Sequence, residues 1–288
     1  MTAHIIDGKA IAAELKDNIK KDVTALKEKG TAVGLAVILV GDDPASQVYV
    51  GSKIKACEAV GIISTEQRLS DDATEEEICH LIKNLNFNPE IHGILLQLPL
   101  PDHLADVQES LVQEIDPRKD VDGLTTVNAG KLFLGHDDGF VSCTPQGSLR
   151  LIKSVEKNLS GKHAVVIGRS NLFGKPMAQL LLQENCTVTT AHSRTQNIET
   201  LCKQADILVA AVGRTEMVKA DWVKDGAIVI DVGINRQPPK VEGGKSKLLG
   251  DVDFDAVKEI ASAITPVPGG VGPMTIACLL ANTVKATQ

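Results

Sequence analysis

Apolar and polar positions occur along the chain in blocks that predict helices and strands in turn. Apolar residues recur every three or four positions between Ile11 and Leu26, which predicts a helix that ends at Gly30. Residues 33–40 follow as a continuous apolar run, as expected of a strand that is covered on both faces. The chain therefore begins with a helix and a buried strand.

The same alternation continues to about residue 100. A second helix is predicted from Pro44 to about Gly61, because proline favours the first turn of a helix. Thr74 and Glu77 have the spacing of a capping box, which predicts the start of a third helix. Residues 91–99 predict another buried strand that prolines close. We interpret this part as a β-α-β-α-β unit with a parallel sheet.

A second alternating block follows an interruption. Residues 116–135 are polar and turn-rich, and we interpret them as a loop region between domains. A helix is predicted to begin near Gly174, and an apolar helix at 274–286 follows a loop rich in Gly and Pro. Further strands are predicted at 163–168, 186–191, 206–212 and 227–232. This block predicts a second parallel sheet.

These elements predict an α/β fold with two domains. Each domain would have a mainly parallel sheet flanked by helices, the second would be Rossmann-like, and the active-site cleft would lie between them. The first domain is expected to span 1–144, with the C-terminal helix in 270–288 packing back on it. The second domain is expected to span 145–269.

A glycine at the end of a predicted strand indicates a phosphate site. Gly168 ends the strand, and Gly174 opens a helix whose N-terminal amides can hold a phosphate group. The two glycines are further apart than in the usual G-x-G-x-x-G pattern, so for this turn alone a turn without a ligand is at least as good an interpretation. Arg169 and Ser170 lie between them.

The end of the next strand favours NADP over NAD. No carboxylate follows residues 186–191, where an NAD-binding fold places one for the ribose hydroxyl. Arg169, Ser193 and Arg194 instead offer guanidinium and hydroxyl groups that suit a 2′-phosphate. The competing interpretation is that these arginines are solvated surface residues.

Glycines also follow the last two predicted strands of this block. The carboxyl ends of parallel strands face the ligand crevice in an open α/β sheet. Gly213, Gly233 and Ile234 are therefore candidates for the nicotinamide side of a cofactor site. Ordinary turn glycines are an equally good interpretation.

The first block carries candidate catalytic residues. Tyr49 and Lys53 are four residues apart on a predicted helix, so their side chains share a face, and a lysine near an apolar wall can move protons near neutral pH. Gln97 ends a buried strand, where ligands bind. Asp120 and Asp122 alternate around one residue, so only one of them is expected to point into a given site.

Composition excludes several other classes of protein. The 288 residues carry a net charge of −7, which argues against nucleic acid or an anionic membrane as the main partner. No apolar run is long enough to span a bilayer, and we expect no secretory signal. The six cysteines form no C-x-x-C pair, which predicts no zinc site and favours a reduced compartment, the cytoplasm.

Several stretches together resemble the bifunctional methylenetetrahydrofolate dehydrogenase/cyclohydrolase family, in that family's order along the chain. The matching stretches are 44-PASQVYVGSKIKACEAVGI-62, 97-QLPLP-101, 119-KDVDG-123, 143-CTPQG-147, 166-VIGRSNLFGKPMAQLL-181, 228-IVIDVGIN-235 and 264-ITPVPGGVGPMT-275. Ser142 stands where many members have Pro, and Phe173 stands where a smaller residue is expected. The resemblance implies a homodimer that oxidises 5,10-methylenetetrahydrofolate with NADP and then hydrolyses the methenyl product to 10-formyltetrahydrofolate, without a metal.

The resemblance also implies a role for each candidate residue. Lys53 would be the central catalytic residue, Tyr49 would stack on the aminobenzoyl ring of the folate, and Gln97 would hydrogen-bond Lys53. Asp122 would bind the pterin, and Leu98 would also contact the folate. The folate pocket would be walled by Pro268, Gly269 and Gly270. The cofactor would contact Gly168, Arg169, Ser170, Ser193, Gly213, Gly233 and Ile234.

Two other functions fit parts of the pattern. A different NADP-dependent dehydrogenase would act on a small acid, but it would need a histidine–carboxylate pair, and none of the seven histidines lies in a strong motif. A non-catalytic dinucleotide sensor would have no use for Lys53, Gln97 and Asp122. A short-chain dehydrogenase also uses Y-x-x-x-K, but after its dinucleotide site rather than before it.

Overall fold

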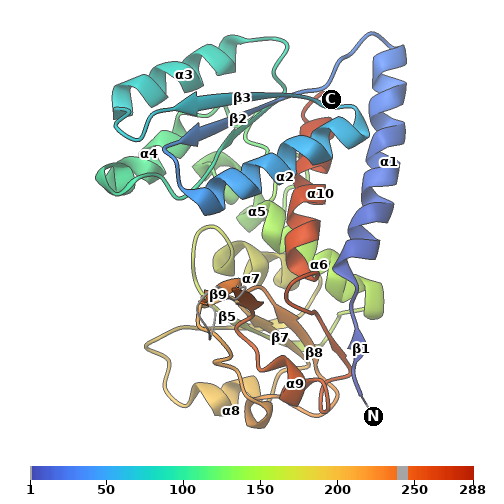
Figure 1. The fold of residues 1–288 in the computed structure, drawn as a ribbon. Helices are drawn as coiled ribbons and strands as arrows, with labels where there is room; N and C mark the ends of the chain where they lie inside the picture. Colours follow the sequence, from blue (N-terminus) through green and yellow to red (C-terminus); the bar gives the residue numbers. More distant parts are fainter. Residues whose placement is uncertain (1, 239–245) are drawn as a thin grey trace. The chain divides into compact units, whose positions relative to one another are not determined.

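The computed structural model describes residues 2–238 and 246–288, which fall into two compact units (Figure 1). The three-stranded unit comprises Ala13–Cys143 and Ile276–Gln288, and the six-stranded unit comprises Met1–Ala12 and Thr144–Thr275. The chain passes from one unit to the other within α1 (Gly8–Glu28), at the start of α6 (Cys143–Val155) and within α10 (Val271–Lys285). Neither unit is therefore one continuous stretch of sequence.

The three-stranded unit has a parallel sheet in the order β3-β2-β4. Its further elements are β2 (Gly34–Val40), α2 (Pro44–Val60), β3 (Ile63–Leu69), α3 (Glu75–Phe87), β4 (Gly93–Leu96), η1 (Asp102–Val107), α4 (Gln108–Gln113) and α5 (Thr126–Leu134). The order β2-α2-β3-α3-β4 is the predicted β-α-β-α-β unit. A central strand buried along its whole length explains why β2 reads as an uninterrupted apolar run.

Alternate residues of β2 face opposite sides of this sheet. Ala36, Ile38 and Val40 pack in one buried cluster with side chains of α3 and α4, including Ile78 and Leu111. The other side contacts α2. Helices on both faces thus hold the carboxyl ends of β2 and β4 in fixed positions, and the candidate residue Gln97 directly follows β4.

Two elements of this unit differ from the sequence interpretation. The strand β3 was not singled out, because it lies at the sheet edge and its half-exposed residues lack an apolar run. The predicted loop at 116–135 contains helix α5, in which the Thr125 hydroxyl accepts a hydrogen bond from Asn128 N and Gly135 ends the helix in a left-handed conformation. Phe133 and Leu134 are exposed, which hid the helical pattern.

Six parallel strands form the sheet of the other unit, within the residues described, in the order β1-β11-β8-β7-β5-β6. Its further elements are β1 (His4–Ile5), β5 (His163–Ile167), α7 (Gly174–Gln183), β6 (Thr187–Ala191), α8 (Ile198–Cys202), β7 (Ile207–Ala210), η2 (Ala220–Trp222), β8 (Ile228–Asp231), β9 (Asn235–Gln237), β10 (Lys247–Leu249), α9 (Phe254–Val257) and β11 (Ala263–Ile264). Strand order reverses between β5 and β7, because β6 lies on one side of β5 and the later strands on the other. Such a reversal marks the ligand crevice of a Rossmann-like sheet.

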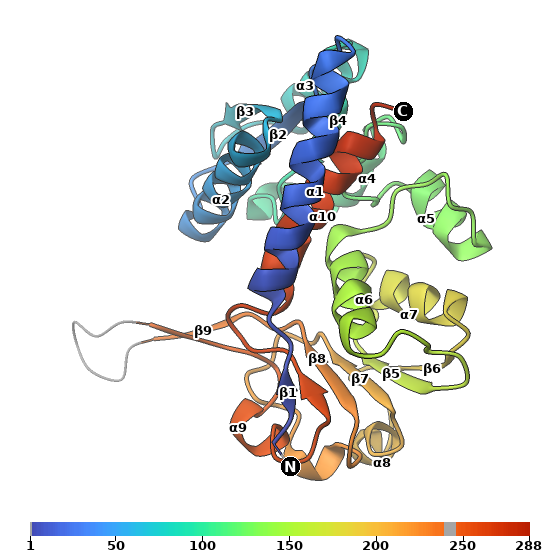
Figure 2. The ribbon, with the colours of Figure 1, turned by 90° about the vertical axis from the view of Figure 1, so that its right-hand side faces the viewer.

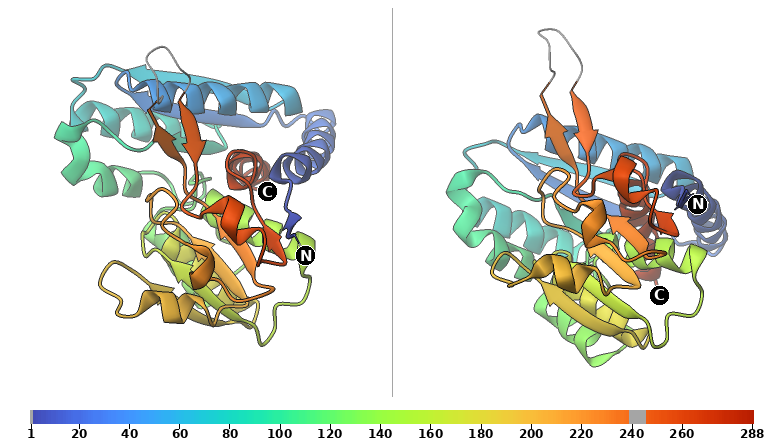
Figure 3. Two further views of the ribbon diagram at one scale, coloured as in Figure 1. Left: turned by 60° about the horizontal axis from the view of Figure 1, so that its bottom comes forward. Right: turned by 90° about the horizontal axis from the view of Figure 1, so that it is seen from below.

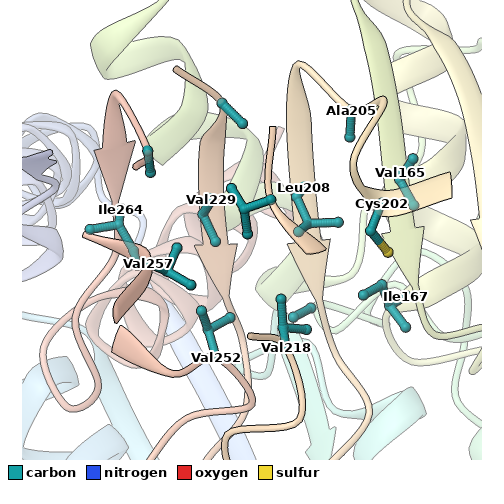
Figure 4. Packing of buried hydrophobic residues seen from close by; sticks show 14 of the residues in the cluster. Val165, Ile167, Cys202, Ala205, Leu208, Val218, Val229, Val252, Val257 and Ile264 are labelled. Carbon is teal, nitrogen blue, oxygen red and sulfur yellow. The ribbon is translucent and has the colours of Figure 1, made fainter. Parts of the chain in front are cut away.

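Helices cover both faces of this sheet. Figures 1 and 2 show α6 and α7 on one face and α8 and α9 on the other. On the second face, Val165, Leu208 and Val229 come from neighbouring strands and share a buried cluster with Val257 of α9 (Figure 4). The two-domain α/β fold with mainly parallel, helix-flanked sheets is thus confirmed.

The N-terminal residues do not lie where the sequence interpretation put them. Residues 1–144 were expected to form one domain, but β1 pairs in parallel with β11, with His4 opposite Ala263. A strand of two residues is too short to show an alternation of apolar and polar residues. It forms because it pairs with the backbone groups that are unpaired at the edge of the second sheet. The antiparallel pair β9 and β10 was also not predicted, and Figure 3 shows it projecting from the unit.

Within the described part of the chain, no helix has both the length and the apolar character needed to cross a membrane.

Candidate active site

Helix α2 carries Tyr49 and Lys53, and its own sequence fixes its ends. An Asp43 carboxylate oxygen accepts a hydrogen bond of 2.7 Å from Ser46 N, and Pro44 occupies the first turn. Gly61 ends the helix in a left-handed conformation. Because the helix begins and ends at defined residues, Tyr49 and Lys53 point to one side of it, as their spacing predicts.

Lys53 is held by contacts on two sides. Its Nζ donates a hydrogen bond of 2.9 Å to Gln97 Oε1 and lies 5.2 Å from the centroid of the Tyr49 ring. The Gln97 Nε2 donates to Leu98 O at 2.6 Å, which turns its Oε1 toward the lysine. Only 6% of Lys53 is exposed, while Tyr49 and Gln97 are half-buried, so these predicted residues form one cluster around a buried amine within the three-stranded unit.

Burial shifts the protonation of this cluster toward neutral forms. It lowers the pKa of Lys53, and the nearby charge of Asp122 opposes this effect only in part. It raises the pKa of Asp122, which the positive charge of Lys53 opposes, and it raises the pKa of Tyr49. A lowered pKa makes a larger fraction of the lysine amine neutral at a given pH, and a neutral amine can accept a proton, as acid–base catalysis requires.

The two aspartates of 119-KDVDG-123 have different surroundings. Asp120 is 1% exposed, and its carboxylate accepts hydrogen bonds from Leu124 N at 3.1 Å, Thr125 N at 2.8 Å and Asn128 Nδ2 at 2.8 Å. These bonds hold the turn before α5. Asp122 interacts electrostatically with Lys53 instead. That only one of the pair faces a bound substrate stays a prediction.

Sequence reasoning missed two residues beside Asp122. Cys143 is buried next to it, and its pKa is raised well above the usual value by burial and by the charge of Asp122. Asn282 of α10 donates to Val121 O at 2.8 Å and to Val141 O at 3.0 Å. A lone cysteine and a helical asparagine carry no pattern, although Cys143 opens one of the quoted motifs.

The predicted folate-pocket residues Pro268, Gly269 and Gly270 belong to the six-stranded unit. They lie in the segment between β11 and α10, which packs closely on the start of α1. A Cβ on Gly8 would collide with the carbonyl of Gly270, and one on Gly269 would lie 3.3 Å from the Lys9 side chain. Their contact with a substrate stays a prediction.

The predicted phosphate-binding turn joins β5 to α7. Gly168 has φ of 136°, and a Cβ there would lie 2.5 Å from Ala211 O at the end of β7. A Cβ on Gly174 would collide with the carbonyl of Gly168. Both positions therefore require glycine, and the turn lies at the point where strand order reverses. This is where a Rossmann-like sheet binds a dinucleotide.

The side chains proposed for the 2′-phosphate surround this turn. Arg169 and Ser193 follow the neighbouring strands β5 and β6 and are exposed, and Arg169 forms no ion pair with any residue that the structure describes. The Ser170 hydroxyl accepts hydrogen bonds from Phe173 N at 3.2 Å and Gly174 N at 3.4 Å, so it binds backbone amides directly before and at the start of α7. Phe173 is buried.

Gly213, Gly233 and Ile234 lie after the paired strands β7 and β8, as predicted. Gly213 and Ile234 are exposed, the latter by 55%. Two buried carboxylates beneath them, Asp231 and Asp251, were missed. Asp231 could have been noticed, because a charged residue inside the apolar run 227–232 needs polar partners. Across the described ranges, no three His, Cys, Asp or Glu residues gather closely enough to hold a metal ion.

Comparison with known proteins covers almost the whole chain. A family model for the tetrahydrofolate dehydrogenase/cyclohydrolase catalytic domain matches residues 6–122, and a model for the NAD(P)-binding domain of the same family matches residues 142–288. The bifunctional protein FolD of Dinoroseobacter shibae is 59% identical over 287 residues, which cover 99% of this chain and 95% of that protein.

Solved structures agree with the sequence matches. The FolD methylenetetrahydrofolate dehydrogenase/cyclohydrolase of Campylobacter jejuni superposes with a TM-score of 0.93 at 48% identity, covering 99% of this chain and 98% of that one. The FolD enzyme of Trypanosoma brucei, solved with NADP and an inhibitor, has a TM-score of 0.93 at 37% identity and covers 99% and 97%.

Proposed function

The chain belongs to the tetrahydrofolate dehydrogenase/cyclohydrolase family, and from this premise we propose how its own residues divide the work of the two reactions. The protein oxidises 5,10-methylenetetrahydrofolate with NADP and hydrolyses the methenyl product to 10-formyltetrahydrofolate. The observation that carries the division of roles is the partly buried hydrogen bond between Lys53 and Gln97, beside Asp122.

Both reactions occur at one carbon of the folate. Bound NADP⁺ would accept a hydride from the methylene carbon, and the two adjacent nitrogens stabilise the cation that remains. Water then adds to this carbon and loses a proton. One carbon–nitrogen bond then breaks, the departing nitrogen takes a proton, and the new hydroxyl loses its proton to become the carbonyl of the formyl group. The hydrolytic step therefore needs a group that both accepts and delivers a proton.

Lys53 has the properties of that group. Burial lowers its pKa, so a larger fraction of the amine is neutral than in a solvated lysine, and a cationic substrate would favour the neutral amine further. Gln97 Oε1 fixes the position of the amine through their 2.9 Å hydrogen bond. Tyr49 would stack on the aminobenzoyl ring, and Asp122 would accept hydrogen bonds from the amino-pyrimidine edge of the pterin, beside Leu98.

The six-stranded unit provides groups that fit a dinucleotide. The glycine-only turn at Gly168 and Gly174 lets a pyrophosphate approach the start of α7. Arg169 and Ser193 are exposed beside it and would hold the 2′-phosphate, with Ser170 nearby. Gly213, Gly233 and Ile234 would face the nicotinamide. Pro268, Gly269 and Gly270 would wall the folate pocket.

The two activities can be measured in one cuvette. Wild-type protein mixed with NADP⁺ and methylenetetrahydrofolate is expected to raise the absorbance of reduced nicotinamide. Methenyltetrahydrofolate added without NADP⁺ is expected to lose its own absorbance as it is hydrolysed. Folded protein that produces neither change would contradict the function.

Replacing Arg169 tests the proposal that this residue binds the 2′-phosphate of NADP. Arg169→Gln is expected to raise KM for NADP⁺ by about 10–100-fold with little change in kcat, because a charge-assisted hydrogen bond of roughly 1.5–3 kcal/mol is lost equally in ground and transition states. The measurement is dehydrogenase kinetics with NADP⁺ and with NAD⁺. Arg150→Gln, an exposed arginine on α6, is the control. An unchanged KM would remove Arg169 from the site.

We further propose that the protein is a cytoplasmic homodimer, that its cofactor residues lie within 145–269, and that its folate residues lie within 1–144 except for those of the segment 268–270. The six cysteines support the cytoplasm, since all are free thiols in the structure. The homodimer follows from the family resemblance. Neither proposal changes the assignment of the catalytic residues.

A further inference from the structure

Two loops of the six-stranded unit leave the sheet side by side and carry the residues proposed to face the nicotinamide. Strands β7 and β8 are paired, with Ala210 opposite Asp231. The loops 211–214 and 232–235 follow them directly. A nicotinamide ring must be held within reach of the reacting carbon, which requires that the loops around it have fixed positions. The contacts beneath the two loops determine whether they do.

A single buried carboxylate holds both loops. Asp251 has no exposed surface, and its Oδ2 accepts hydrogen bonds from Val212 N at 2.6 Å and Gly213 N at 3.0 Å. Its Oδ1 accepts from Arg214 N at 2.8 Å and from Asn235 Nδ2 at 2.9 Å. Three consecutive amides of one loop and a side-chain amide of the other thus converge on one anion.

A second carboxylate fixes the first. Asp231 is 3% exposed, and its Oδ1 accepts from Gly233 N at 3.0 Å and Asp251 N at 2.8 Å, while its Oδ2 accepts from Val252 N at 3.0 Å. Burial raises the pKa of Asp231 to about 7, and these backbone bonds oppose the rise. Asp231 therefore sets the position of the backbone from which the Asp251 carboxylate extends.

Glycines fit closely around both carboxylates. A Cβ on Gly250 would collide with the carboxylate of Asp231, and a Cβ on Gly233 would collide with that of Asp251. The stretches 231-DVG-233 and 250-GD-251 each place a glycine against the other's aspartate. Because the glycines and carboxylates fit together this closely, the two loops can adopt only one arrangement relative to each other.

We propose that Asp251, held by Asp231, is a positioning residue for hydride transfer, because it fixes the loops that carry Gly213, Gly233 and Ile234. This inference rests on the proposed function. The groups proposed for the 2′-phosphate, Arg169 and Ser193, follow β5 and β6 and make none of these contacts. Asp251 thus governs the placement of the reactive ring, and Arg169 governs the strength of cofactor binding.

Asp251→Asn tests this division. An asparagine places an NH₂ group where one carboxylate oxygen accepted two hydrogen bonds. This NH₂ group cannot accept from the N–H groups that face it, so the loops are expected to shift away from it. We expect kcat of the dehydrogenase to fall about 10²-fold, the scale of a misplacement of about 1 Å, while KM for NADP⁺ changes less than about threefold. Hydrolysis of methenyltetrahydrofolate without NADP⁺ is expected to stay within about twofold. This pattern is the reverse of that expected for Arg169→Gln.

A matched control and a milder variant keep the test decisive. Asp253→Asn, two residues further on, breaks only a partly exposed ion pair with Lys219 and is expected to leave both activities unchanged. If Asp251→Asn does not fold, Asn235→Ala removes one of the four donors and is expected to lower dehydrogenase kcat about 3–10-fold at unchanged hydrolysis, the effect of about 1 kcal/mol.

Two results would overturn the inference. One is an Asp251→Asn protein with wild-type dehydrogenase kcat. The other, if that protein does not fold, is an Asn235→Ala protein in which both activities fall together or neither falls. Wild-type protein is measured alongside: if it fails to reduce NADP⁺, the proposed function is wrong, and if it succeeds while the variants match it, only the role of Asp251 is wrong.

Discussion

Lys53→Met is expected to lower the rate of methenyltetrahydrofolate hydrolysis by about 10²–10⁴-fold, the usual contribution of a positioned acid–base group. Methionine has a similar length and is apolar, so it fits the buried position, where only 6% of Lys53 is exposed. The variant therefore removes the amine without opening a large cavity. Gln97 would lose its partner, but its Nε2 would still donate to Leu98 O.

Initial rates of hydrolysis at several pH values provide the measurement. The pKa of Lys53 is lowered by burial, so in the wild type the neutral amine becomes available at a lower pH than for a solvated lysine. The wild-type rate is expected to rise with pH as this amine loses its proton, and the variant is expected to lack that rise. Lys55→Met, on the exposed side of the same helix, is the control. Near wild-type hydrolysis by Lys53→Met would show that another group moves the proton.

Asp122→Asn is expected to weaken both reactions by about 10²-fold, because both use the same bound folate. A hydrogen bond to a charged group contributes up to about 3 kcal/mol, and 1.4 kcal/mol is a factor of ten. The amide keeps the size of the carboxylate but presents a donor toward the amino-pyrimidine donors of the pterin. Steady-state kinetics of both reactions, with folate affinity from ligand titration, measure the effect.

Asp120→Asn is compared with Asp122→Asn to distinguish an effect on folate binding from an effect on stability. Asp120 accepts three hydrogen bonds that hold the turn before α5, so its replacement is expected to lower the free energy of unfolding more than Asp122→Asn does. Thermal unfolding of both variants measures this difference. The assignment would be reversed if Asp122→Asn proved the less stable protein and kept normal folate affinity.

Strong local patterns made most of the fold predictable. The strand β2 is buried on both faces, and the start of α3 has its capping box, with the Thr74 and Glu77 side chains bonded to each other's backbone. Elements that depend on distant partners were not predictable. The strand β1 exists because β11 offers an edge, and β3 is half-exposed, so neither has a pattern of its own.

The candidate site divides in the same way. The separation of Tyr49 and Lys53 by one helical turn is a local property, and Gln97 was identified because it ends a strand. The carboxylates Asp231 and Asp251 were not identified, because their importance arises from backbone donors 20 to 39 residues away in the sequence. A sequence shows that a buried charge needs partners, but it does not show which backbone amides will supply them.

The interleaving of the two units has a consequence for how the protein is made. Cys278 to Leu280 of α10 are buried in the three-stranded unit, and Asn282 bonds to backbone groups more than 100 residues earlier. The ribosome synthesises these residues after all the strands of the six-stranded sheet. The three-stranded unit therefore cannot close until α10 has been made, so its unfinished apolar surface must stay out of aggregates while the other sheet is synthesised.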